Sequence, residues 1–125
     1  MTSYQKKVLD GLWSLAVRTR DMFRCQRCLK QHDQKSKGLH AHHILTKGAN
    51  GFSTRWELMN GVAVCYGCHM YLQGNPVENE KFARSLGVDY DWLKAHGKKT
   101  IKVFYEEKRQ ELRDIISDLN CGRSN

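Results

Sequence analysis

The chain has 125 residues, of which 40% are hydrophobic and 27% are charged, and its formal net charge at pH 7 is +8. A chain of this length forms one domain with one modest core, and its three Trp and five Tyr residues argue against a disordered protein. We find no apolar run long enough to cross a membrane, no signal peptide and no repeat, which predicts a cytoplasmic protein with no membrane partner.

The positive charge is concentrated in the first half of the chain. Residues 1–60 contain 11 Lys or Arg against 4 Asp or Glu, whereas residues 61–125 contain 10 against 9. A basic face of this kind neutralises phosphates and is typical of a protein that binds nucleic acid. A solvated basic surface without a partner is the alternative. The candidate DNA-binding residues are Arg18, Arg20, Arg24, Arg27, Lys47 and Arg55.

The first predicted element is an amphipathic helix over about residues 4–20, in which apolar residues recur with the spacing of one helical face. Residues 29–38 are predicted to form a polar loop and residues 39–45 a short strand. Residues 46–53 are rich in Gly, Asn, Ser and Thr and should turn the chain. A second strand is expected over residues 62–65.

Four helices are predicted in the second half. The first opens at His69 and stops near Gly74-Asn75-Pro76, and two short helices follow over about 77–86 and 90–96, each ended by a glycine. The last helix, about 101–119, should pack on the first helix or on a second subunit, so a homodimer is one expectation. Its apolar residues are Ile101, Phe104, Leu112, Ile115, Ile116 and Leu119.

Four of the five cysteines form two C-x-x-C pairs, Cys25 with Cys28 and Cys65 with Cys68, and Cys121 is left over. Each pair can present two thiolates to one ion, so the spacing predicts a tetrahedral Cys₄ structural zinc site. Redox-active cysteines are the alternative, but no βαβ pattern surrounds either pair. A structural zinc would also stabilise a fold whose apolar core is thin.

The stretch "HAHHIL", residues 40–45, places three of the six histidines within four positions. Together with the two C-x-x-C pairs, with Asn60 five residues before Cys65, and with His69 directly after Cys68, it resembles the zinc-bound ββα-metal motif of the HNH endonucleases. The longer stretch "AHHILTKGANGFSTRWELMNGVAVCYGCHMYLQGNP" resembles the phage NinG/Rap recombination endonucleases.

The resemblance implies an α+β fold, with a small treble-clef-like ββα-metal core cross-linked by a Cys₄ zinc. Residues 1–24 would form an N-terminal basic helix, residues 25–75 the core, and residues 76–125 the C-terminal helices of a single domain. It also implies a metal-dependent DNA endonuclease that acts on branched or recombination-intermediate DNA, in a bacterial host cell if the chain is phage-encoded, with no small-molecule substrate.

By position in the motif, His43 resembles the general base, and His42 and His69 resemble the two ligands of a catalytic divalent metal. A neutral imidazole can accept a proton from water at neutral pH, provided that a carbonyl or side chain orients its second nitrogen. Asn60 matches the central Asn, which looks like a brace for the loop between the strands. His42 and His43 would leave a regular strand on opposite faces, so the strand should end or twist there.

Related enzymes often carry Asp at the position of His42. A pair of imidazoles favours Zn²⁺, Mn²⁺, Co²⁺ or Ni²⁺ relative to Mg²⁺, which leaves the catalytic metal open. Two alternative functions also stay open, namely an HNH nicking or restriction enzyme acting on linear duplex DNA and a non-catalytic zinc DNA-binding module. His40 is not required by the motif and is expected to be structural.

Overall fold

We describe the protein from a computed structural model, which places residues 1–46, 54–99 and 101–123. Within these ranges the fold is α+β, with five helices and one two-stranded antiparallel sheet, as predicted. The elements are α1 (Ser3–Arg20), β1 (Leu39–His43), β2 (Gly61–Cys65), α2 (Tyr66–Gln73), α3 (Pro76–Ser85), α4 (Tyr90–Gly97) and α5 (Tyr105–Arg123), with a 3₁₀ turn, η1, at Leu58–Asn60.

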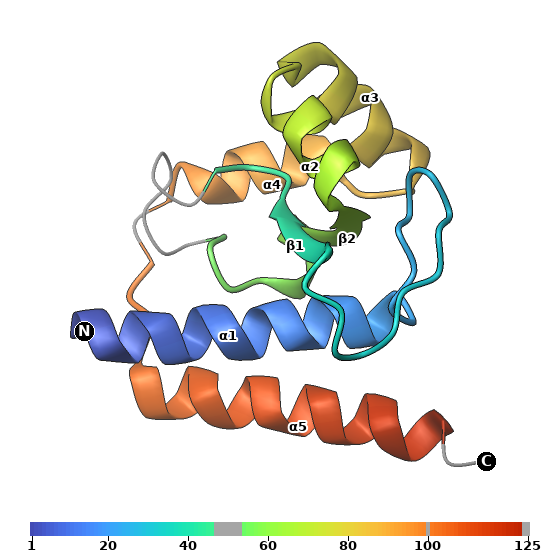
Figure 1. Ribbon diagram of the computed structural model, residues 1–125. Coiled ribbons are helices and arrows are strands. Elements are labelled where there is room, and N and C mark those ends of the chain that lie inside the picture. Colours follow the sequence, from blue (N-terminus) through green and yellow to red (C-terminus); the bar gives the residue numbers. More distant parts are fainter. Residues whose placement is uncertain (47–53, 100, 124–125) are drawn as a thin grey trace.

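Helix α1 lies between the sheet and α5 (Figure 1). The side chain of Thr2 caps its first turn, and the side chain of Gln5 binds back to the Thr2 backbone N–H, an arrangement that satisfies two N–H groups at the helix start. Its buried face, which includes Leu9 and Trp13, packs against Leu112 of α5. The predicted packing of the last helix on the first is therefore confirmed.

Helix α5 begins later and ends later than predicted. Residues 101–104 precede it. Ile101 and Phe104 are exposed, while Val103 packs against the core cluster that contains Leu9 and Trp13. Leu112 is buried within the chain itself, which removes it from the surface that a second subunit could contact. The homodimer stays a prediction.

The sheet pairs β1 with β2 in an antiparallel register that sets His42 opposite Val62 and His43 opposite Gly61. Strand β2 is almost continuously apolar and buried, because α1 covers one face of the sheet and α2 lies against the other. Gly61 is required at its start, since an added Cβ would lie 2.5 Å from atoms of Trp13 and Val17. The sheet thus lies directly against the Trp13 ring.

Strand β1 ends at His43, two residues earlier than predicted. The backbone N–H of Ile44 still donates to the Asn60 carbonyl (2.9 Å). At Leu45 the side chain of Asn60 takes over, because its Oδ1 accepts from the Leu45 N–H (2.8 Å) and its Nδ2 donates to the Leu45 carbonyl (3.1 Å). A side chain therefore replaces the strand ladder at this point, and the strand ends at His43, next to the position at which the resemblance called for an end or a twist.

Helix α2 begins at Tyr66, with Cys65 as the residue before its first turn. His69 consequently lies inside the first turns of α2 rather than opening the helix as predicted.

Helix α3 begins at Pro76, which needs no N–H partner at that position, and α4 begins after Asp89, whose side chain accepts from the Trp92 N–H (3.0 Å). None of the helices in the described ranges is long and apolar enough to cross a membrane.

Candidate metal centres and catalytic cleft

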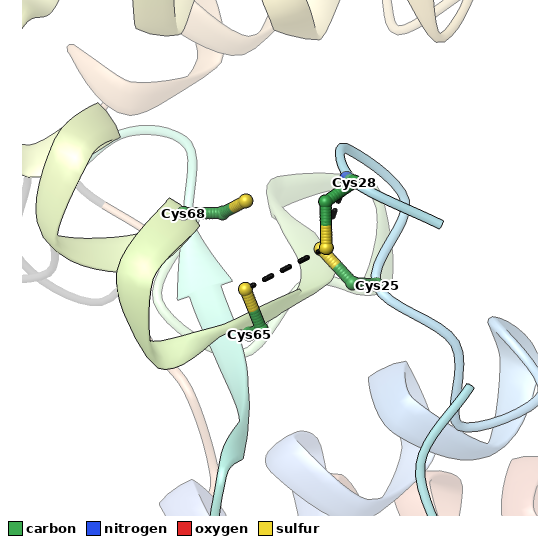
Figure 2. Close-up of side chains that lie close together, drawn as sticks. All are labelled: Cys25, Cys28, Cys65 and Cys68. Carbon is green, nitrogen blue, oxygen red and sulfur yellow. Dashed lines mark hydrogen bonds between the residues drawn. The ribbon is translucent and has the colours of Figure 1, made fainter. Parts of the chain in front are cut away.

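The four cysteines of the two C-x-x-C pairs come together at one point (Figure 2). Cys25 and Cys28 lie on the loop after α1, and Cys65 and Cys68 lie at the junction of β2 and α2. Their Sγ atoms all lie within 4.8 Å of one another, and those of Cys28 and Cys65 are 3.7 Å apart. A tetrahedral zinc with bonds of about 2.3 Å would place its sulfurs about 3.8 Å apart. The cluster therefore fits a structural metal ion such as zinc.

Backbone contacts explain how the loop after α1 returns to the sheet. The N–H of Gln26 donates to the Ala63 carbonyl (2.9 Å), and the carboxylate of Asp21 accepts from the Ala63 N–H (2.8 Å). Met22, Phe23 and Leu29 adopt positive φ angles, which tightens the loop. The first C-x-x-C pair is thus fixed to the strand that leads into the second.

The thiols of the cluster differ in acidity. Burial alone would raise the pKa of Cys25, but backbone N–H groups of Cys28, Cys65 and Arg27 outweigh it and lower this pKa to about 6. Burial raises the pKa of Cys68 to about 12, although the Arg27 guanidinium, 3.4 Å from its Sγ, opposes the shift. A thiol of this kind becomes a thiolate at neutral pH when a cation binds it.

A second cluster joins His42 of β1 to His69 of α2. The two rings meet edge to face with centroids 5.2 Å apart. His42 is 3% exposed, and the Nδ1 atoms of both rings are buried without a hydrogen-bond partner in the described part of the chain. A buried nitrogen without a partner is costly unless an ion or water meets it. The two unpartnered Nδ1 atoms are therefore candidates for such a ligand, and the catalytic divalent metal expected at His42 and His69 stays a prediction.

The surroundings of both rings favour their neutral form. Burial lowers the pKa of His42, with a smaller opposing effect from the side chain of Asn79. Burial also lowers the pKa of His69, and the nearby His42 and His40 lower it further. A neutral imidazole keeps one lone pair for a metal. His40 stacks on His69 with centroids 5.1 Å apart, so it contacts the cluster although no metal role was predicted for it.

His43 leaves β1 on the opposite face from His42 and stacks on Trp13 of α1, with ring centroids 3.9 Å apart and planes 10° from parallel. Its Nε2 lies 2.9 Å from the backbone carbonyl of Arg55. A carbonyl only accepts, so Nε2 carries the proton and Nδ1 is the basic nitrogen of the neutral ring. A carbonyl thus orients the second ring nitrogen of His43, while its role as a general base stays a prediction.

Asn60 is fully buried and ties three backbone groups together. Besides its two bonds to Leu45, its Nδ2 donates to the Thr54 carbonyl (3.1 Å). Both polar atoms of the side chain are thus bound to the backbone. The geometry is that of the predicted brace, and it fixes the end of β1 on which His42 and His43 are carried.

All three histidines of interest line one open cleft of about 900 Å³. Asp10 and Trp13 of α1 form one wall, and Leu72 of α2 and Asn79 of α3 form another. Asp10 also binds the Arg55 guanidinium (2.8 Å) and the Trp56 indole N–H (2.9 Å), which holds the segment that carries the Arg55 carbonyl. No local sequence signal marks Trp13, Asp10 or Asn79 as part of the site, because their partners lie far away in sequence.

Several of the arginines predicted to bind DNA make contacts within the chain. Arg20 donates to the carbonyls of Leu58 and Gly61 (both 2.7 Å), and Arg55 is paired with Asp10. Arg27 lies over the Tyr71 ring, 4.2 Å from its centroid. Arg18 donates to Ser14, and Arg24 donates to the Leu29 carbonyl. DNA binding by these residues stays a prediction, and Lys47 lies outside the described residues.

Comparisons with protein-family models, with curated proteins and with solved structures find no match for this chain. Two features of the structure bear on function, namely the Cys₄ cluster and the three histidines that share a cleft.

Proposed function

We propose that the protein is a metal-dependent DNA endonuclease with the ββα-metal core of the HNH enzymes. The observation that supports it best is the environment of His43. A hydrogen bond to the Arg55 carbonyl and a stack on Trp13 fix this ring. It lies next in sequence to the buried His42, which meets the half-buried His69, and the Nδ1 atoms of those two rings are buried without a partner in the described residues. A histidine that only filled space in the core would not need a pair of possible metal ligands beside it.

Hydrolysis of a phosphodiester requires a water to lose its proton as it attacks phosphorus. In the proposed reaction His43 accepts that proton at Nδ1, and its Nε2–H stays bound to the Arg55 carbonyl, which stabilises the imidazolium that forms. His42 and His69 would hold a divalent metal, which would polarise the phosphate and stabilise the departing 3′-oxygen. Asn60 keeps the strand end in place and takes no part in proton transfer.

We further propose that the substrate is branched or recombination-intermediate DNA, as in the phage NinG/Rap enzymes that the sequence resembles. The excess of basic residues in the first half of the chain supports binding to phosphates on more than one duplex arm. Phosphate contacts position a protein without reading base sequence, so a protein of this kind would select DNA by shape.

Matched linear, flapped and four-way DNA substrates with the same arm sequences test the proposal. We expect cleavage with Mg²⁺, Mn²⁺, Co²⁺, Ni²⁺ or Zn²⁺, no cleavage with EDTA, and faster cutting of the branched substrates. Binding without cleavage under every metal would favour the non-catalytic zinc module. Equal rates on linear DNA would remove the preference for branches, and dependence on one base sequence would favour a restriction-type enzyme.

A further inference from the structure

The side chain of Asn79 joins α3 to the end of β1, the strand that carries His42 and His43. It lies near the start of α3, is half-buried and lines the same cleft as His42. Its Oδ1 is 2.7 Å from Nε2 of His42, and its Nδ2 donates to the Ile44 carbonyl at 2.9 Å. One amide group thus holds both the ring of His42 and the backbone two residues further along.

These two contacts together determine which nitrogen of His42 carries the proton. The Ile44 carbonyl can only accept a hydrogen bond, so the amide must turn its NH₂ group toward Ile44. The amide oxygen must then face His42, and because an oxygen of this kind only accepts, Nε2 of His42 must be the N–H donor. The lone pair of the neutral ring is left on Nδ1, the atom that is buried without a partner in the described residues.

We propose that Asn79 is a positioning residue that fixes His42 in its Nε2–H form and so makes Nδ1 the nitrogen that binds the divalent metal. The inference rests on the metal site of the proposed function and adds a residue to it. Partners of this kind set the tautomer and ring orientation of a metal-binding histidine, and their loss costs about 10–100-fold in metal affinity.

The tautomer can be measured without any DNA. Zinc-loaded protein with ¹⁵N-labelled histidine, at about pH 8 where an ordinary imidazole is neutral, should show His42 protonated at Nε2 and unprotonated at Nδ1. In Asn79→Ala the preference for Nε2–H should be lost. A wild-type His42 that carries its proton on Nδ1 would overturn the inference.

Calorimetric titration of the same zinc-loaded protein with Ni²⁺ tests the consequence. We expect Asn79→Ala to bind Ni²⁺ about 10–100-fold more weakly than wild type while it keeps its zinc and its melting temperature. Asn79→Asp loses the donor to the Ile44 carbonyl but retains an oxygen acceptor for Nε2–H, so it should bind Ni²⁺ more tightly than Asn79→Ala does. Asn75→Ala is the matched control, because Asn75 is exposed one turn earlier and its Nδ2 donates to the Tyr71 carbonyl.

Unchanged Ni²⁺ affinity in Asn79→Ala would contradict a positioning role, as would equal losses in the Asp and Ala variants. The nuclease proposal fails separately. If wild type shows the expected tautomer and binds Ni²⁺ but cuts no DNA, the role of Asn79 stands and the proposed reaction does not.

Discussion

The neighbouring residues His42 and His43 differ because successive side chains leave a strand on opposite faces. His42 meets Asn79 and His69 on the side of α2 and α3, whereas His43 stacks on Trp13 of α1. Each ring has one nitrogen bound to an acceptor, an amide oxygen for His42 and a carbonyl for His43. Two identical side chains thereby acquire different surroundings, as the proposed roles of a metal ligand and a base would require.

Asn60 gives a prediction at this scale. Asn60→Ala should lower the free energy of unfolding by at least about 2 kcal/mol, because each buried polar group left unpaired costs about 1–3 kcal/mol. Urea unfolding of the zinc-loaded protein measures this. The exposed Asn75→Ala is the control and should change stability by less than about 1 kcal/mol. An equal effect of the two variants would show that Asn60 does not brace the strand end.

Between helices and strands, the close approach of α1 to the sheet controls the position of the Trp13 ring. That approach depends on Gly61, where an added Cβ would lie 2.5 Å from Trp13 and Val17. The Trp13 indole N–H is also bound to the Glu57 carbonyl (2.8 Å), so the ring has little room to retreat. The packing of α1 on the sheet therefore also determines the position of the ring that stacks on His43.

Gly61→Ala should destabilise the protein by about 1–3 kcal/mol, as expected when a well-packed core is overfilled. Gly67→Ala is the matched control, because nothing lies within 4 Å of an added Cβ in that helix. It should be neutral or stabilising by up to about 1 kcal/mol. Denaturant unfolding of both variants decides the point, and a similar effect at the two glycines would contradict the packing described.

The sequence predicted the helices, the strands and the Cys₄ cluster because their signals are local, in apolar spacing and in C-x-x-C pairs. It did not predict η1, the bonds that Arg20 and Arg55 make within the chain, or the contact of Asn79 with His42. Those features depend on chain segments that meet only after folding, as Arg20 meets the Leu58 carbonyl and Asn79 meets the end of β1. The side chain of Asn60 also shortened β1 in a way that strand propensity does not encode.

For the whole molecule, the Cys₄ cluster joins the loop after α1 to the junction of β2 and α2. Cys28→Ser should release about one zinc per chain and unfold most of the domain, because metal-binding free energy is folding free energy in sites of this kind. Zinc content and thermal unfolding measure the effect. Cys121→Ser, at an exposed position of α5, should change neither. Native zinc content and melting temperature in Cys28→Ser would disprove a structural metal here.

His43 is the proposed base of a nuclease whose fold does not depend on it. The most direct measurement is the single-turnover rate of DNA cleavage by His43→Ala at saturating enzyme, beside its zinc content, melting temperature and DNA affinity. We predict a loss of at least about 10²-fold in rate, the usual contribution of a positioned base, with zinc, fold and affinity retained. Cleavage at the wild-type rate at neutral pH would contradict the account.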